Sequence, residues 1–250
     1  MRKQITSAAI LLSLASSGAF AADWFTGSPM TSRPAGPFNP IASLDLSFTA
    51  ANDQLAGALV GTFAPFGGLE QNGFRLRMIG LLGGYKYDAT AVGVGQVTGN
   101  QVGGSLLMGY EWIVDRTKIG IYGGLDVMNN RLDKFDPTND TEGTTVGGRI
   151  GLDFYSRPTD ATMAAGTFTY STANNGYYMR LRGGIAVYGE TFLGPELLVQ
   201  GDNFYTQWRL GVGLSGIALG PVQIGVSGGY VNDSSRGNGA YGILDTRLAF

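Results

Sequence analysis

Residues 240–250 read AYGILDTRLAF, and the alternation within this stretch decides the fold. Every second residue, counted back from the end, is apolar or small, whereas the residues between them include a tyrosine and two charged side chains. The two sets are Ala240, Gly242, Leu244, Thr246, Leu248 and Phe250, and Tyr241, Ile243, Asp245, Arg247 and Ala249. Successive side chains on a strand point to opposite faces, so one face suits lipid and the other suits water. This dyad repeat is typical of a transmembrane β-strand.

The two ends of the chain both indicate export to a bacterial envelope. Phe250 falls on the apolar face of its strand, which resembles the C-terminal signal that the insertion machinery reads in outer-membrane barrels. At the other end, Arg2 and Lys3 precede an apolar stretch over 8–14. The letters AFA at 19–21 then supply the small-x-small pattern of a secretory cleavage site. We therefore predict a cleaved signal peptide over 1–21.

The rest of the chain divides into a short lead-in and one domain. Residues 22–40 contain four prolines and little alternation, which indicates a periplasmic lead-in. Over 41–250 the dyad repeat continues, and no segment reaches the roughly 18–20 consecutive apolar residues that a membrane helix needs. The sequence predicts an all-β fold, an antiparallel up-and-down transmembrane β-barrel of about twelve strands. The predicted strands are 42–50, 54–64, 73–87, 101–113, 117–130, 144–156, 162–172, 176–188, 191–201, 205–217, 221–231 and 240–250.

The lengths of the connections test this assignment independently. If the first strand starts at the periplasm, the connections after even-numbered strands lie there, and most of them are short. The connections after odd-numbered strands include the longer polar stretches 89–100, 131–143 and 232–239. Short periplasmic turns and longer outer loops are typical of such barrels. The stretch 65–72 is an exception, because it is long for a periplasmic turn.

Composition excludes several classes of function. The chain has 41 glycines, no cysteine and no histidine. Without histidine, the Ser-His-acid arrangement of barrel-borne hydrolases cannot be built, and without cysteine there is no thiolate site. When Arg2 and Lys3 are removed from the 17 basic residues, 15 remain against 19 acidic ones, so no basic surface indicates nucleic acid.

Charged and tyrosine side chains share one face of the predicted strands. In 144–156, for example, Ile150 and Leu152 alternate with Arg149 and Asp153. An Arg or Lys that faces lipid at mid-depth costs about 2–4 kcal/mol, so the mixed set is expected to face the lumen. The predicted lumen residues are Arg75, Arg77, Arg149, Arg180, Arg182, Arg209, Arg247, Asp45, Glu111, Asp126, Asp153, Glu196, Asp245, Tyr85, Tyr87, Tyr122, Tyr155, Tyr178, Tyr188 and Tyr241.

Two interpretations of this lumen face stay open. In the first, the charges pair across strands and fill the lumen, because unpaired charges in a narrow interior are costly. In the second, the lumen is a polar conduit or a glycan-binding interior, with tyrosine faces stacked on sugars and charged groups bonded to hydroxyls. The candidate glycan-binding residues are Arg180, Arg182, Glu196, Arg209, Glu111, Asp126, Arg149 and Tyr178. Glu196 and Arg209, on adjacent predicted strands, are expected to pair.

Three further features have structural interpretations. Pro195 has no N–H for a ladder, which predicts an edge-like or bulged site beside Glu196. The acidic stretch 133–142 is expected to be a solvated outer loop; it has oxygen ligands for weak Ca²⁺ binding but lacks the spacing of a calcium loop. We predict no metal site and no cofactor. The outward aromatic residues are expected to be girdle anchors at the membrane interfaces, and they are Tyr110, Trp112, Tyr177 and Trp208.

Several short motifs occur in an order and spacing that resemble one family. They are Gly109-Tyr110-Glu111-Trp112, Asp136-Pro137-Thr138-Asn139 before Gly143-Thr144, Tyr178 to Arg182 (YMRLR), Gly194-Pro195-Glu196, Arg209-Leu210-Gly211, and Gly228-Gly229-Tyr230 through Tyr241-Gly242. On these motifs, the chain from about residue 70 to the end resembles the BcsS-type cellulose biosynthesis proteins, secreted envelope proteins of alphaproteobacteria.

The resemblance implies a role in producing or exporting cellulose, or a related exopolysaccharide, at the outer membrane of a Gram-negative bacterium. It brings no catalytic residues with it. The expected function is a non-enzymatic barrel that assists this process, as a conduit or as an anchor for the secretion machinery. The expected partners are outer-membrane lipids, the polymer, and its synthesis and export machinery, and nucleic acid is not expected.

Other functions and one other fold compete with this expectation. The nearly balanced lumen charges also permit a small-solute porin. A lipid- or glycan-modifying barrel enzyme is disfavoured because the chain has no histidine. A soluble β-sandwich would share the alternating strands but would not readily explain the many long, nearly consecutive strands or the terminal Phe250.

Overall fold

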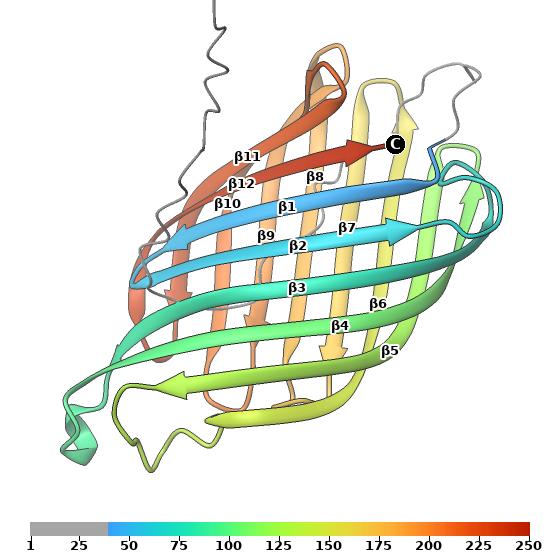
Figure 1. Ribbon diagram of the computed structural model, residues 1–250. Coiled ribbons are helices and arrows are strands. Elements are labelled where there is room, and N and C mark those ends of the chain that lie inside the picture. The colour runs from blue at the N-terminus through green and yellow to red at the C-terminus, as the bar shows by residue number, and fades with distance from the viewer. Residues whose placement is uncertain (1–39) are drawn as a thin grey trace, which may run out of the picture.

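The computed structural model describes residues 40–250, which form one closed antiparallel β-barrel (Figure 1). The predicted signal peptide 1–21 and all of the lead-in except its last residue lie outside the described residues. A single turn of 3₁₀ helix, η1 (Thr90–Val92), follows the third strand. The strands are β1 (Ala42–Ala51), β2 (Gln54–Phe63), β3 (Gly73–Asp88), β4 (Gln96–Val114), β5 (Thr117–Leu132), β6 (Gly143–Thr159), β7 (Thr162–Ser171), β8 (Tyr177–Tyr188), β9 (Thr191–Gly201), β10 (Thr206–Leu219), β11 (Val222–Asp233) and β12 (Gly237–Ala249).

The barrel closes between its first and last strands. β1 pairs with β12 in antiparallel register, from Ser43 opposite Ala249 to Ala51 opposite Tyr241. All other pairs join strands that are consecutive in sequence, so the topology is up-and-down and none of the strands within 40–250 is an edge strand. The predicted fold and its twelve strands are confirmed. The largest difference is at β4, which begins five residues earlier than expected because 96–100 continue the ladder with the end of β3.

The connections at the two ends of the barrel differ in length. Four of the turns after even-numbered strands have only two residues, 115–116, 160–161, 189–190 and 220–221, whereas the longest connection at the other end covers 133–142. Gly189 and Gly220 adopt left-handed φ angles of 54° and 62° in two of these tight turns, a conformation that glycine allows without strain. We call the end with the tight turns the periplasmic end and the opposite end the outer end.

The long β2–β3 connection, 64–72, folds back onto the periplasmic end of the barrel. Leu69 is only 1% exposed, and its N–H donates to the carbonyl of Pro40 at 2.7 Å. The Arg75 guanidinium donates to the carbonyls of Gly68 and Gln71, at 3.3 and 2.5 Å. The exceptional length of this turn therefore corresponds to an ordered segment that packs against the barrel.

The outer surface of the barrel is apolar and carries aromatic clusters near both ends. Every strand exposes at least one large apolar side chain. Near the periplasmic end, Tyr110 contacts Phe74 and Trp112, with ring centroids 5.2 and 4.9 Å apart. Near the outer end, the Trp208 and Tyr230 rings lie 5.5 Å apart. Such girdles are typical of membrane interfaces. Among residues 40–250, no helix has the length and apolar content to cross a membrane.

Two local predictions need correction. Tyr188 was expected in the lumen but is 86% exposed. It ends β8, where the register with β9 shifts between Ala186 and Tyr188 and the alternation is lost, since Val187 is exposed too. Pro195 was expected at an edge-like or bulged site. Its ladder with β8 is interrupted, as at an edge, but the pairs on either side keep one register, Arg182 opposite Glu196 and Ile185 opposite Leu193, so the bulged alternative is wrong.

Candidate functional site

The structure places all eight candidate residues inside the barrel. Each is at most 9% exposed, and they are Arg180, Arg182, Glu196, Arg209, Glu111, Asp126, Arg149 and Tyr178. They do not form one site. They divide among three polar clusters at different places along the lumen, and binding of a glycan by any of them stays a prediction.

The first cluster joins strands on different sides of the lumen. Glu196 on β9 forms ion pairs with Arg180 and Arg182 of β8, at 2.7 and 2.6 Å. Both arginines also pair with Asp245 of β12, at 3.1 and 2.6 Å. Because β8 and β12 are four strands apart in the barrel, these ion pairs cross the lumen.

Arg209 was predicted as the partner of Glu196, and the structure links the two through a third side chain. The Tyr241 hydroxyl donates to Glu196 at 3.1 Å, and the Arg209 guanidinium lies 5.5 Å from the centre of the Tyr241 ring. Arg209 also donates to the Gln207 side chain at 2.8 Å, and Gln207 donates to Gln54 across the lumen at 3.0 Å. Neutral glutamines were not among the predicted residues, because only charges and tyrosines were selected.

The second cluster lies toward the periplasmic end. Glu111 pairs with Arg75 at 2.6 Å and with Lys118 at 2.8 Å, and it accepts the Tyr122 hydroxyl at 2.6 Å. Arg77 stacks on the Tyr122 ring, with its guanidinium carbon 3.6 Å from the ring centre. The sequence analysis missed Lys118, although it has the same parity as Tyr122 within one strand and could have been found from it.

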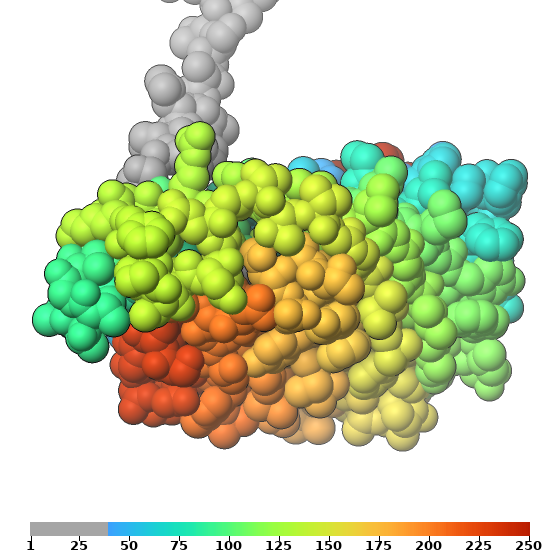
Figure 2. Space-filling model, turned by 90° about the horizontal axis from the view of Figure 1, so that it is seen from below, coloured from blue at the N-terminus to red at the C-terminus, as the bar shows by residue number. Residues whose placement is uncertain are grey.

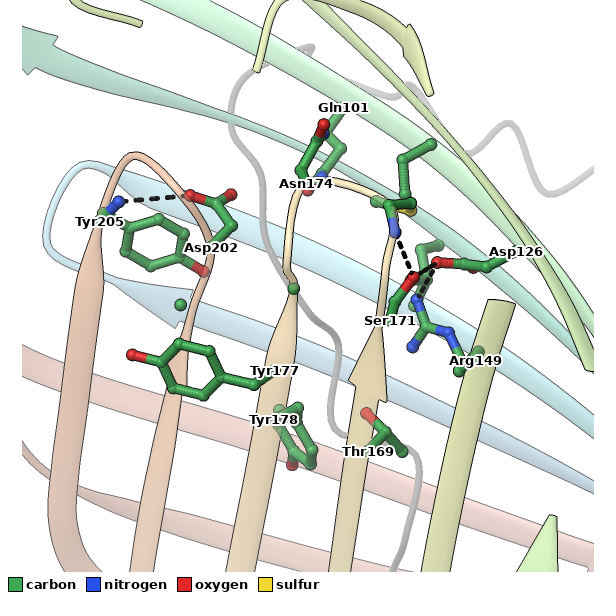
Figure 3. A pocket seen from close by; sticks show the side chains of 15 residues that line it. Gln101, Asp126, Arg149, Thr169, Ser171, Asn174, Tyr177, Tyr178, Asp202 and Tyr205 are labelled. Atoms are coloured by element: carbon green, nitrogen blue, oxygen red, sulfur yellow. Dashed lines mark hydrogen bonds and ion pairs between the residues drawn. The ribbon is translucent and has the colours of Figure 1, made fainter. Parts of the chain in front are cut away.

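The third cluster surrounds Asp126 in the outer half of the lumen (Figure 3). Its carboxylate pairs with Arg149 at 2.9 Å and accepts the hydroxyls of Ser105 and Ser171. Beside it lies a cavity of about 50 Å³, whose lining includes Asp126, Arg149 and Tyr178. Three of the eight candidates therefore meet at one cavity.

Aromatic side chains from opposite rims meet over the outer end of the lumen. Tyr87 of β3 contacts Phe204 of the β9–β10 loop, with ring centroids 4.8 Å apart, although β3 and β9 are six strands apart. Arg236, which pairs with Asp233, lies over the Tyr205 ring at 4.6 Å. Figure 2 shows the β3–β4 and β5–β6 connections gathered with the β11–β12 end at one end of the molecule. We call this group the outer cap, and its residues are Tyr85, Tyr87, Phe204, Tyr205, Asp233 and Arg236.

The acidic stretch 133–142 supports the outer cap. Asp136 accepts the Tyr87 hydroxyl at 2.8 Å, and the N–H and hydroxyl of Thr138 at 2.9 and 2.7 Å. Burial alone would raise the pKa of Asp136, but these hydrogen bonds outweigh it and lower the pKa. In the part of the chain that the structure describes, no group of three His, Cys, Asp or Glu side chains could hold a metal ion.

The pKa of Asp202, in the β9–β10 loop, is shifted in the opposite direction from that of Asp136. Burial raises the pKa of its carboxyl to about 6, against the backbone N–H groups of Phe204 and Tyr205, which donate to it at 2.8 and 3.2 Å and lower the pKa. The lumen as a whole combines paired charges, hydrogen-bonding amides and tyrosine rings. Such groups can hold each other in place or hydrogen-bond a polar ligand.

Several solved structures have a fold similar to that of this barrel. The KdgM porin is 14% identical, with a TM-score of 0.50, and the match covers 83% of this chain and 99% of that chain. The transport unit of the autotransporter AIDA-I from Escherichia coli is 8% identical, with a TM-score of 0.48 and coverages of 89% and 93%. Outer membrane phospholipase A from Escherichia coli is 13% identical, with a TM-score of 0.45 and coverages of 87% and 94%. The match to the KdgM porin shows that the two proteins share a β-barrel fold, and at 14% identity the likeness concerns the fold alone.

The family assignment comes from a separate comparison. No curated protein matches the chain. The family model for "Cellulose biosynthesis protein BcsS" matches residues 42–250, which is the whole barrel from the first residue of β1 to Phe250. The match confirms the resemblance that the short motifs indicated. The chain belongs to the BcsS family of cellulose biosynthesis proteins.

Proposed function

We propose that this protein is a non-enzymatic outer-membrane barrel that assists the biosynthesis or export of cellulose, or of a related exopolysaccharide, by anchoring the secretion machinery. Family membership supports the pathway, and the apolar outer surface with its aromatic girdles supports the location in the outer membrane. The sequence left a conduit and an anchor open. The lumen favours the anchor.

The observation that carries this choice is the way polar side chains cross the lumen. Arg180 and Arg182 reach Asp245 four strands away, Arg77 of β3 pairs with Asp153 of β6 at 2.6 Å, and aromatic rings meet over the outer end. A glucan chain that passed through would have to break several buried ion pairs. Breaking one such pair costs about 3–5 kcal/mol, because an uncompensated charge is left behind.

Planar-bilayer conductance of the purified protein separates an anchor from a conduit or a porin. An anchor with a cross-linked lumen gives no stable open steps with ordinary ions. Stable steps in most insertions would overturn this proposal in favour of a channel. A matched variant, Arg180→Ser with Asp245→Ser, removes both ion pairs between β8 and β12 and is expected to raise the frequency of open events.

The link to the pathway needs a second experiment. Deleting the gene should lower the amount of extracellular cellulose or change its attachment to the cell, and the cloned gene should restore it. Restoration by the Arg180→Ser, Asp245→Ser variant as well would show that the sealed lumen is not what the pathway needs. An unchanged amount, localisation and texture of the polymer in the deletion strain would discard the pathway.

The absence of catalysis is also a proposal. The chain has no histidine, and its buried carboxylates are engaged with arginines, lysine and hydroxyls. Incubation of the purified protein with lipid and glucan substrates should give no turnover. Turnover that disappears in Glu196→Gln or Asp126→Asn would establish an enzyme instead.

A further inference from the structure

The cavity beside Asp126 is open to a ligand from outside the barrel. Its lining comes from the outer parts of the neighbouring strands β3 to β9 and from the β7–β8 and β9–β10 loops (Figure 3). Its rim includes Asn174 and Asp202, which belong to the β7–β8 and β9–β10 loops and keep part of their surface exposed. A ligand can therefore approach from the outer end.

Two polar side chains of the cavity make no hydrogen bond within the described barrel, residues 40–250. Gln101 is 7% exposed and Thr169 is 4% exposed, and neither side chain makes a hydrogen bond to any residue among 40–250. The cavity therefore offers an amide and a hydroxyl to a hydrogen-bonding molecule from outside the barrel.

The other groups of the lining define what that molecule can be. Tyr178 lies directly across the strand pair from Thr169 and is 2% exposed, so it supplies an aromatic wall beside the free hydroxyl. Asp126 and Arg149 neutralise each other, and Asp202 adds a carboxylate at the rim. An anionic ligand would meet this carboxylate without an uncompensated cation to balance it. A neutral, hydroxyl-rich ligand fits the lining better.

We propose that this cavity binds the end of a neutral glucan, with hydroxyl groups of the terminal sugar bonded to Gln101 and Thr169 and the sugar ring held at the rim. A volume of about 50 Å³ holds a few water molecules, so it takes one edge of a sugar, whose hydroxyls replace those waters. The proposal deepens the proposed function, because it makes the anchor a holder for the polymer at the cell surface.

Binding of cellotetraose to the purified barrel in detergent, measured by calorimetry, tests the site. We expect saturable binding that falls roughly tenfold in Thr169→Val, which removes one hydrogen bond worth about 1.4 kcal/mol and keeps the shape of the side chain. Gln101→Leu should weaken binding at least as much. Tetragalacturonate, an anionic oligosaccharide, should bind more weakly than cellotetraose.

Thr49→Val is the matched control, because Thr49 is another fully buried lumen hydroxyl without a hydrogen bond, on β1 and outside the cavity. This variant should bind like the unchanged protein. Absence of saturable binding, equal losses in Thr49→Val and Thr169→Val, or preference for the uronate would overturn the site. The unboiled gel mobility of each variant verifies that the barrel is folded.

The outcome is separable from that of the proposed function. If cellotetraose binds as expected but the deletion strain makes unchanged cellulose, the site stands and the pathway fails. If the deletion lowers cellulose but no binding occurs, the pathway stands and the site fails.

Discussion

The replacement Glu196→Gln tests whether water is excluded from the ion pairs that cross the lumen. Glu196 is 1% exposed and accepts hydrogen bonds from four side chains. They are Arg180 at 2.7 and 3.0 Å, Arg182 at 2.6 Å, Ser227 at 3.0 Å and Tyr241 at 3.1 Å. The amide keeps the shape of the side chain but removes its charge, so the two arginines lose one carboxylate and keep their ion pairs with Asp245. Breaking a buried ion pair in this way costs about 3–5 kcal/mol, so we expect a loss of this size in the free energy of unfolding.

The measurement is urea unfolding in detergent, followed by tryptophan fluorescence and by the fraction of protein that keeps its folded mobility on an unboiled gel. Asp160→Asn is the control. Asp160 pairs with Arg116 at 2.6 Å, as short as the Glu196 contacts, but their side chains are 86% and 55% exposed. An exposed pair contributes at most about 1 kcal/mol. If the two variants lose equal stability, water reaches the Glu196 cluster and the cross-linked lumen inferred above is wrong.

Three other changes have specific expected results. Arg75→Met removes the donor that holds the carbonyls of the 64–72 turn, so limited proteolysis should cut this turn faster than in the unchanged protein; an equal rate would show that Arg75 does not order it. Burial raises the pKa of Asp202 to about 6 in the folded state from 3.8, so its ionisation destabilises the fold progressively as pH rises from about 4 to 6. Asp202→Asn should therefore gain urea resistance relative to the unchanged protein as pH rises through this range, and a constant difference would contradict the assignment. Gly194→Ala would place a Cβ 1.9 Å from a backbone carbonyl oxygen and should prevent assembly of the heat-modifiable form, whereas Gly61→Ala, with open space around its Cβ, should assemble normally.

The strands and their faces could be predicted because both depend on neighbouring residues. Alternation between Arg149, Ile150 and Asp153 already separates the lumen from lipid, whichever strand lies next to it. The exception is Tyr188, where an irregularity in the ladder interrupts the alternation. The sequence of β8 alone does not predict this shift in register with β9.

The partners within the lumen could not be predicted, because they depend on the tilt and stagger of the closed sheet. Glu196 and Arg209 lie on adjacent strands, which suggested a pair, but the stagger brings the arginines of β8 to Glu196 and brings Asp245 from β12 to the same arginines. The outer cap was also not predicted, since Tyr87 and Phe204 meet only after the barrel has closed. The cavity also could not be predicted, because it depends on the stagger of the sheet and on the closure of the barrel.

Because β1 and β12 pair with each other, a different strand could come first in the chain without a change in the closed barrel. The N–H of Ala42 donates to the carbonyl of Phe250, and the N–H of Phe250 donates to the carbonyl of Ala42, both at 2.9 Å, so a short linker could join these two ends. Domains whose ends lie this close commonly tolerate circular permutation. A chain reopened at the Gly189–Glu190 turn would begin with β9 and end after β8 on Tyr188, which is an exposed aromatic residue like Phe250.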